Sequence, residues 1–349
     1  MFLIKPLGLF QKIFVIKLSS RTDHRDSMSL SAAFTDLNIE YVNSIAEDEE
    51  KILSPDGSKT NLNEADLEVW RAHKNVARMI VEQNITSALV LEEGVDWDLH
   101  IKAQMQDFAN ASRLLVQPLL NKPDQHLDPT YPQPSTSQYA QDFMVGEYFT
   151  TNPSTSPYGD VDRWDLFWLG HCGCRFPRPS DRNAPLGRAI IAHDETVPEP
   201  EHVDIQFGSE ELVRKYPAHT RVVSRARMNS CALGYGISLP GARRLLYEFD
   251  VHEVNTADMV LRSMCDGGDG RPSRACLTVQ PELFQLHRPV GSRSRWGDVL
   301  GHGSGYSEQT VTRNIRWSTR ANLRKLVDGE TDYIEQFKDK EQTSKLGYE

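Results

Sequence analysis

The 349-residue chain has too few positive charges for a protein whose whole surface binds nucleic acid or anionic lipid. Its 39 lysines and arginines are outnumbered by 49 aspartates and glutamates, which gives a net charge of −10. A general basic surface is therefore excluded, although a local basic site is compatible with this balance. From this charge balance we predict no nucleic-acid partner. No apolar run approaches the roughly 18 residues of a membrane-spanning helix, so we also predict no membrane span.

Several familiar catalytic motifs are also missing. The sequence has no Gly-x-Gly-x-x-Gly, no Walker-type phosphate loop, no Gly-x-Ser-x-Gly elbow and no His-Glu-x-x-His. Each of these patterns serves one chemistry: dinucleotide binding, phosphate binding, serine-nucleophile hydrolysis and zinc-dependent proteolysis. Their absence argues against dehydrogenases, serine hydrolases and zinc proteases.

Cysteine is scarce, and its five positions leave two interpretations open. An odd number of cysteines leaves at least one thiol free or intermolecular. Cys172 and Cys174 are too close together for the usual zinc spacing. The cysteines are therefore either buried or free thiols, or Cys265 and Cys276 close a loop in an oxidising compartment.

The composition that remains is that of a globular protein with one large domain or two ordinary ones. Apolar residues make up 39% of the chain, and its length is sufficient to bury a large core. Residues 1–11 form an N-terminal lead without a clear cleavage site, so we expect no signal peptide. Residues 118–160 are rich in Pro, Ser, Thr, Gln and Tyr and predict an irregular insertion. Residues 300–349 are polar and predict a partly ordered C-terminal tail.

Apolar segments alternate in a way that predicts an α/β fold. Residues 12–18, 40–45 and 87–91 have the character of strands, and residues 25–37 and 63–83 have the character of helices. This order predicts βαβ units and a mostly parallel sheet flanked by helices. Ligands of such sheets bind beyond the carboxyl ends of the strands, which places the loops after Leu18 and Leu91 at the expected site.

The loop after Leu91 is densely acidic. It contains Glu92, Glu93, Asp96 and Asp98 within seven residues. Carboxylates at this density repel one another, and a hard cation such as Mg²⁺ or Mn²⁺ would neutralise them and also bind substrate phosphates. The alternative from spacing alone is a solvated acidic turn.

Two further segments carry candidate binding groups. Arg21 and Arg25 follow the first strand, and their guanidinium groups would bind a diphosphate. The alternative is that they belong to the charged first turn of a helix, where the negative charge of Asp23 complements the helix dipole. Arg71 and His73 lie on the helix that precedes the acidic loop, but they are two positions apart and do not share a face. A single helical histidine is more often a packed or surface residue than a catalyst.

The order of these pieces resembles family 25 glycosyltransferases, which include lipooligosaccharide and procollagen galactosyltransferases. The resemblance begins with Lys12-Ile-Phe-Val-Ile-Lys-Leu-Ser-Ser-Arg-Thr-Asp-His-Arg25, Trp70-Arg-Ala-His73 and Ala88-Leu-Val-Leu-Glu-Glu-Gly-Val-Asp-Trp-Asp98. Three later segments resemble a fungal branch of the family: Trp168-Leu-Gly-His-Cys-Gly173, Ala232-Leu-Gly-Tyr-Gly-Ile-Ser238 with Gly241-Ala-Arg-Arg-Leu-Leu246, and Cys276-Leu-Thr-Val-Gln-Pro-Glu-Leu-Phe284 with His287-Arg-Pro289. The resemblance covers residues 12–299 in order.

The resemblance implies a GT-A-like, Rossmann-like domain over residues 12–299 and transfer of galactose or glucose from a UDP-sugar to a glycan or protein hydroxyl. It implies a Mn²⁺ or Mg²⁺ ion, with Glu92, Glu93 and Asp96 as metal-binding candidates. The donor-binding candidates are Arg21, Asp23, Arg25 and Arg71. The catalytic candidates are Asp258, as the base, and His73.

The acidic loop departs from the family pattern. Where the family has Glu-Asp-Asp, this chain has Glu92-Glu-Gly94. Gly94 supplies no carboxylate, and its flexibility would let Asp96 reach in as a substitute ligand. The chain is then either an active enzyme with altered metal ligation or an impaired pseudoenzyme that binds sugar nucleotide or glycan. A Mg²⁺-dependent phosphoesterase is a third, weaker interpretation.

The compartment also has two readings. The resemblance implies the secretory pathway, in the lumen of the endoplasmic reticulum or Golgi. The lack of a clear signal peptide or anchor favours the cytoplasm instead.

Overall fold

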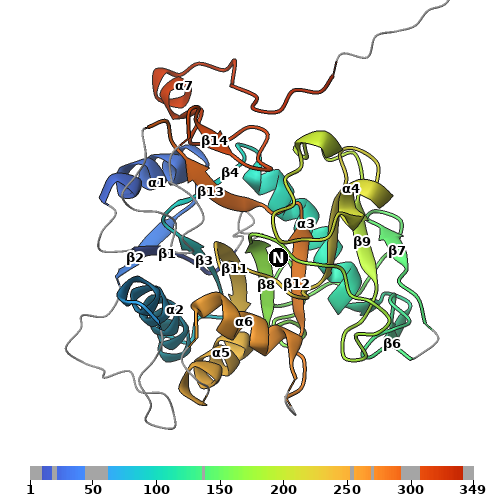
Figure 1. Cartoon of the computed structure of the whole chain (residues 1–349). Helices are drawn as coiled ribbons and strands as arrows, with labels where there is room; N and C mark the ends of the chain where they lie inside the picture. The colour runs from blue at the N-terminus through green and yellow to red at the C-terminus, as the bar shows by residue number, and fades with distance from the viewer. Residues whose placement is uncertain are drawn as a thin grey trace, which may run out of the picture.

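The computed structural model describes residues 10–17, 22–43, 62–135, 138–251, 255–268, 271–291 and 307–340 (Figure 1). Arg21 and most of the N-terminal lead lie outside the described residues, as does the side chain of Asp23. No helix in the described ranges is long and apolar enough to span a membrane.

A nine-stranded sheet forms the centre of the described structure, in the order β2-β1-β3-β11-β8-β12-β10-β9-β7. Strands β1, β2 and β3 pair in parallel, as the alternating pattern predicted, and so do β8 with β12 and β7 with β9. Only β10 and β11 run against the others, so the sheet is mixed but mostly parallel. The predicted α/β class with a flanked sheet is confirmed. The bounds of these strands are β1 Lys12–Lys17, β2 Ile39–Asn43, β3 Ser87–Glu92, β7 Asp142–Met144, β8 Leu166–Gly170, β9 Arg188–Ile191, β10 Arg221–Arg225, β11 Gly234–Ser238 and β12 Cys276–Gln280.

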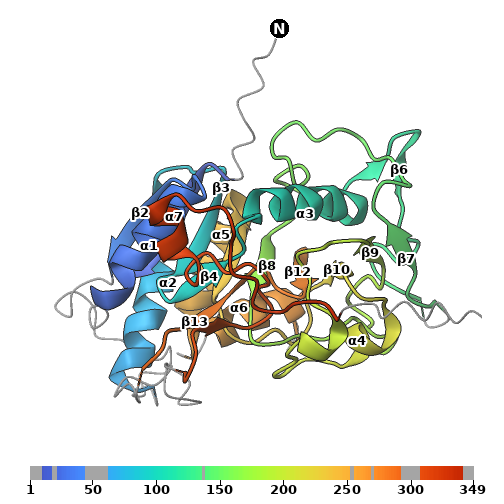
Figure 2. The same cartoon turned by 90° about the horizontal axis from the view of Figure 1, so that it is seen from above.

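Helices cover both faces of the sheet because alternate strand residues point to opposite sides. Ile13 and Val15 of β1 join the core beneath α1 and α3, whereas Phe14 and Ile16 join the core beneath α2, α5 and α6. Figure 2 shows the strands between α3 on one side and α6 on the other. The helices are α1 Thr22–Phe34, α2 Glu64–Glu82, α3 Ile101–Val116, α4 Glu211–Lys215, α5 Leu239–Val251, α6 Ala257–Asp266 and α7 Leu323–Asp328, with a 3₁₀ turn at Pro200–His202.

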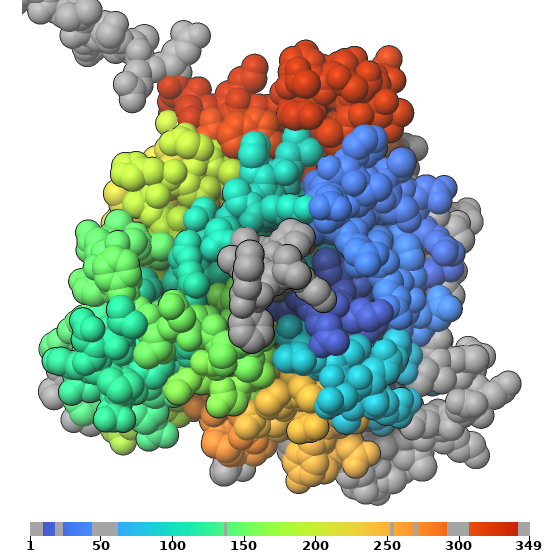
Figure 3. Space-filling view, turned by 180° about the vertical axis from the view of Figure 1, so that it is seen from behind, coloured from blue at the N-terminus to red at the C-terminus, as the bar shows by residue number. Residues whose placement is uncertain are grey.

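A second, three-stranded sheet joins the acidic loop to the C-terminal part of the chain. It consists of β14 Val311–Thr312, β13 Phe284–Arg288 and β4 Val95–Trp97, all antiparallel. Residues 307–340 pack beside α1, as the red and blue atoms in Figure 3 show. Ser318, Thr319 and Asn322 in this segment are fully buried. The segment from Ser307 to Lys340, which was expected to be part of a polar tail, is therefore packed against the rest of the structure. Hydrogen bonds, more than apolar contacts, hold it there, so its polar composition did not reveal this packing.

The insertion at residues 118–160 contains regular structure that its composition did not reveal. Pro118–Leu119 (β5) and Lys122–His126 (β6) form a hairpin, and β7 adds an edge strand to the central sheet. Asp160 ends the insertion by accepting hydrogen bonds from the backbone and side chains of Ser154 and Thr155. The remainder of the insertion is irregular, as predicted.

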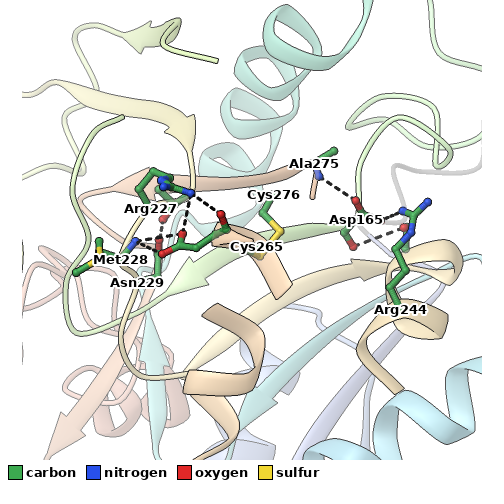
Figure 4. The surroundings of a disulfide bond; sticks show 11 residues. Asp165, Arg227, Met228, Asn229, Arg244, Cys265, Ala275 and Cys276 are labelled. Atoms are coloured by element: carbon green, nitrogen blue, oxygen red, sulfur yellow. Dashed lines mark hydrogen bonds and ion pairs between the residues drawn. A yellow bond between two sulfur atoms is a disulfide. The ribbon is translucent and has the colours of Figure 1, made fainter. Parts of the chain in front are cut away.

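Two disulfides cross-link the described structure. Cys265–Cys276 joins the end of α6 to the start of β12 (Figure 4), so the loop-closure interpretation holds for this pair. Cys172–Cys231, which the sequence did not predict, joins the segments after β8 and before β11. Cys174 is a free, buried thiol.

Candidate functional site

The carboxyl ends of β1, β2 and β3 form one edge of the sheet, and the acidic loop after β3 lies there. The predicted loop after Leu18 lies outside the described residues. The starts of α1 and α2 adjoin the same edge, because each helix returns across the sheet to the beginning of the next strand. Strand β11 begins at this edge too, with Gly234 opposite Leu91. Side chains from well-separated segments therefore converge where parallel α/β sheets bind ligands.

The first turn of α1 lies against the acidic loop. A side chain at Gly94 would start 3.6 Å from the ring of His24 and 3.3 Å from Leu286 Cδ2. In the same turn, the Arg25 guanidinium lies 5.0 Å from the centre of the Tyr41 ring, and the Tyr41 hydroxyl donates to the Arg25 carbonyl at 3.0 Å. The first turn of α1, which follows β1 in the sequence, thus meets the loop after β3.

Glu92 and Glu93 differ in exposure. The Glu92 side chain is 27% exposed, whereas Glu93 is 3% exposed. The Glu93 carbonyl accepts a 2.7 Å hydrogen bond from the guanidinium of Arg320, which the C-terminal segment supplies. The pKa of Tyr41 is raised overall, chiefly by burial and also by the Glu93 charge. A hydrogen bond with Ser29 and the charges of Arg25 and Arg320 act in the opposite direction. The charges of Glu93, Arg25 and Arg320 therefore all act on the Tyr41 hydroxyl.

His73 lies behind Glu92 and is fully buried. Its Nδ1 is 3.0 Å from the Tyr235 hydroxyl, and its Nε2 is 3.7 Å from Glu92 Oε1. Burial and then the Glu92 charge raise the pKa of Tyr235. The Tyr235 hydroxyl is the hydrogen-bond partner of Nδ1, whereas Nε2, at its 3.7 Å distance from Glu92, makes no hydrogen bond among the described residues.

Asp96 is fully buried, and the protein itself satisfies both of its carboxylate oxygens. Oδ2 accepts from the hydroxyls of Thr312 and Ser318, and Oδ1 accepts from the backbone N–H groups of Trp97 and Arg320. Burial alone would raise the pKa of Asp96, but hydrogen bonds and the nearby charge of His287 bring it below its ordinary value. Asp96 was a metal-binding candidate, and the structure instead uses its carboxylate to fasten the C-terminal segment to β4.

Asp258 and Asp66 lie near the starts of α6 and α2, close enough for the charge of Asp258 to act on Asp66. Asp258 accepts hydrogen bonds from the Cys231 and Met259 backbone and from the Thr256 hydroxyl. Burial and then the charge of Asp258 raise the pKa of Asp66. The pair thus combines a carboxylate fixed by hydrogen bonds with one that retains its proton more readily.

Arg71 pairs with a residue of its own helix. Its side chain is 17% exposed, and its guanidinium lies 3.1 Å from the carboxylate of Glu64, the first residue of α2. His73, two positions later, points inward, which agrees with the expectation that the two residues do not share a face.

Sequence reasoning missed three residues at this edge: Tyr41, Tyr235 and Arg320. Tyr41 and Tyr235 lie in β2 and β11. Because successive side chains of a strand point to opposite faces of the sheet, the strand pattern could have shown which face each tyrosine occupies. Arg320 had no local signal, because its partner Glu93 is 227 positions away in the sequence.

A candidate metal-ligand group lies elsewhere in the structure. Among the described residues, Glu195, His219 and Asp339 form a triad whose ligand atoms lie within 4.8 Å of one another, whereas the acidic loop forms no such group. The Arg316 guanidinium already contacts Asp339 at 2.6 Å and supplies the positive charge there. The triad therefore carries no metal assignment.

Comparison with models of known protein families and with curated proteins found no match for this sequence.

Proposed function

We propose that the chain is a metal-dependent glycosyltransferase that transfers a hexose from a UDP-sugar to a hydroxyl group of a glycan or protein. The observation that carries the proposal is the contact between the first turn of α1 and the Glu92-Glu-Gly94 loop at the carboxyl edge of the sheet. Parallel β2-β1-β3 order, with antiparallel β11 beside β3, is consistent with the GT-A-like fold that the resemblance implies. A nucleotide donor would bind across this edge.

Arg25 is the described residue best placed to contact the donor phosphates. Its guanidinium offers several N–H donors to phosphate oxygens, and its packing against the Tyr41 ring restricts where it reaches. Arg21 and Asp23 stay donor-binding predictions from the resemblance. Arg71, which pairs with Glu64 at the start of α2, also stays a donor-binding prediction.

Glu92 and Glu93 would hold the Mn²⁺ or Mg²⁺ ion. Carboxylate oxygens suit these cations, which often use one or two protein carboxylates together with substrate phosphates. His73 Nε2 lies 3.7 Å from Glu92 Oε1 and would close to a hydrogen bond to orient that carboxylate when the ion is bound. When bound, the ion would neutralise charge that develops on the departing UDP.

The acceptor hydroxyl would lose its proton to the pair of carboxylates between α2 and α6. Asp258 is the proposed base, and hydrogen bonds from the Cys231 and Met259 backbone hold its carboxylate in place. The charge of Asp258 contributes to the raised pKa of Asp66, so a proton on either carboxylate affects the other. His73 serves as a positioning residue in this scheme.

Binding of UDP, measured by calorimetry with and without Mn²⁺, tests the donor site. We expect Mn²⁺-dependent binding that Glu93→Gln weakens by about tenfold or more, since removing a charge-assisted interaction costs roughly 1.5–3 kcal/mol. Glu82→Gln, an exposed change at the far end of α2, is the matched control and should bind like the native protein. Folded protein that binds no UDP in either condition would refute the proposal.

A non-catalytic protein that binds sugar nucleotide or glycan is the second candidate. It is favoured by the hydrogen bonding of Asp96 and of Asp98, whose buried carboxylates both accept from protein groups. Because Gly94 supplies no carboxylate, Glu92 and Glu93 are the loop's remaining carboxylates for a metal. The double substitution Glu93→Asp/Gly94→Asp distinguishes the two candidates in a sugar-transfer assay. A large gain in turnover would identify the native loop as impaired. Release of inorganic phosphate from simple phosphoesters would instead support the phosphoesterase interpretation.

We also propose the secretory lumen as the compartment. Disulfides persist in oxidising environments, and Cys172–Cys231 and Cys265–Cys276 are both formed in this structure. Mass spectrometry of the protein from its native cells, after alkylation without reduction, tests this: four blocked cysteines are expected, and five alkylated ones would contradict it.

A further inference from the structure

A cavity of about 170 Å³ opens at the edge of the sheet opposite the proposed donor site. Its walls include Arg225, the last residue of β10, and Cys276, the first residue of β12. These strands are antiparallel neighbours, with Arg225 opposite Leu277, so the cavity adjoins the amino ends of the parallel strands. The Cys265–Cys276 disulfide forms part of its wall (Figure 4).

Arg225 is a buried cation with little to neutralise it. The residue is 5% exposed, and its guanidinium makes one hydrogen bond in the described structure, a 3.3 Å contact from Nη2 to the Leu115 carbonyl. That carbonyl belongs to the last turn of α3, where the helix dipole favours a positive charge. A guanidinium has five N–H groups, so one carbonyl leaves most of its donor capacity unused.

The two carboxylates whose charges act on Arg225, those of Asp128 and Asp165, are hydrogen-bonded to other groups. Asp128 accepts from the Thr130 backbone and hydroxyl and from the Gly187 backbone. Asp165 accepts from the Ala275 backbone and pairs with Arg244, as Figure 4 shows. Burial lowers the pKa of Arg225, and the charges of Tyr131, Asp128 and Asp165 only partly oppose that effect. A buried charge without a close counter-ion is costly, so a bound anion would be favoured here.

A second arginine lines the same cavity. Arg274 is partly buried and makes no side-chain hydrogen bond or ion pair with the part of the chain that the structure describes. The ring of Tyr131 closes one side of the cavity and lies 5.6 Å from the Arg225 guanidinium.

We propose that this cavity binds a small oxyanion group, phosphoryl or carboxylate, through Arg225 and Arg274. Guanidinium groups bind such oxygens in pairs of parallel hydrogen bonds, and the unused donors of Arg225 provide one such pair. A volume of about 170 Å³ accommodates a group of several heavy atoms. The ligand is either a free anion or the charged end of a larger molecule, and the site does not depend on the proposed glycosyl transfer.

Equilibrium dialysis with radiolabelled inorganic phosphate and with labelled acetate tests the proposal on the full-length protein. We expect one site per chain for at least one of these anions, and about tenfold weaker binding after Arg274→Ala, the effect of removing one charged interaction. Arg225→Lys keeps the charge but loses the paired geometry, so it should also weaken binding. Arg243→Ala, on the exposed side of α5, is the control and should leave binding unchanged.

Three results would overturn the inference. The first is no binding of either anion to folded protein at concentrations up to about 10 mM, which corresponds to negligible affinity. The second is binding that Arg274→Ala does not alter, since this partly exposed residue can be changed without unfolding the chain. The third is displacement of phosphate by UDP, which would place the anion at the donor site. Arg274→Ala should leave Mn²⁺-dependent UDP binding intact, so failure of one site is distinguishable from failure of the other.

Discussion

Replacing Asp96 with asparagine should reduce the stability of the fold while sparing metal-dependent binding of UDP. The change keeps the shape of the side chain but replaces Oδ2, which accepts from Thr312 and Ser318, with an amide nitrogen. The two hydroxyl groups would then face a donor instead of an acceptor. Oδ1, bonded to the Trp97 and Arg320 backbone, can keep its role.

The size of the effect follows from the hydrogen bonds that the substitution removes. A hydrogen bond to a charged group contributes roughly 1.5–3 kcal/mol, and breaking one side of a buried charged arrangement costs about 3–5 kcal/mol. Because both hydroxyl groups lose their acceptor and the negative charge beside His287 disappears, we expect a destabilisation of about 3–5 kcal/mol. That is a large share of a typical domain stability of about 5–15 kcal/mol.

Urea unfolding followed by tryptophan fluorescence measures this destabilisation, because Trp97 is buried next to Asp96. Asp250→Asn, an exposed change on α5, should shift the unfolding free energy by less than about 0.5 kcal/mol and serves as the control. Calorimetry below the unfolding transition should give a Mn²⁺-dependent UDP affinity within about twofold of the native value.

The opposite pattern would refute this reasoning. If Asp96→Asn left stability unchanged and lowered Mn²⁺-dependent binding about tenfold, Asp96 would be a metal ligand as the sequence pattern indicated. The hydrogen bonds to Thr312 and Ser318 would then not be the main use of the carboxylate.

Three other substitutions or conditions have defined outcomes. Tyr235→Phe should cost about 1–3 kcal/mol in urea unfolding, since it leaves the buried His73 Nδ1 without its partner; an unchanged midpoint would contradict that pairing. Cys172→Ala/Cys231→Ala, which opens a span of 59 residues, should cost about 4 kcal/mol, and Cys265→Ala/Cys276→Ala, with a span of 11, about 3 kcal/mol by loop-closure entropy; the reverse ranking in thermal unfolding would count against this account. Burial would raise the pKa of Asp160, but hydrogen bonds from Gln117, Ser154 and Thr155 lower it to about 2. Its contribution to stability is therefore full above about pH 4 and is lost as the pH falls toward 2. Asp160→Asn should flatten that part of the stability–pH curve, and an unaltered curve would refute the assignment.

The parts of the fold that were predictable have strong local signals. Residues 12–18 and 87–91 form continuous apolar runs, and they appear as β1 and β3 with nearly the same bounds. Helix α2 was predicted at residues 63–83 because its apolar positions follow the helical period and Asn63 provides the N-cap. The sheet edge that brings their loops together follows from the parallel order alone.

The rest depended on interactions between residues far apart in the sequence. Ser318 and Asn322 are buried although their segment is poor in aliphatic residues, because their polar groups find partners in β4 and within the segment. No hydrophobic pattern reports such burial. The Cys172–Cys231 bond was equally hidden, since it requires that the end of β8 lie beside the start of β11. Asp96 was assigned to a metal because three of its four hydrogen-bond donors lie more than 200 positions away.

The same separation has a consequence for synthesis of the protein on the ribosome. The backbone donor at Arg320 emerges 224 residues after Asp96. At about 5–20 residues per second, the interval lasts on the order of 10–45 s. During that time the C-terminal segment cannot cover β4, and the Asp96 carboxylate, which is buried in the final structure, stays exposed to water. The acidic loop beside β4 therefore acquires its final geometry among the last events of biogenesis, after the strands on which it is built.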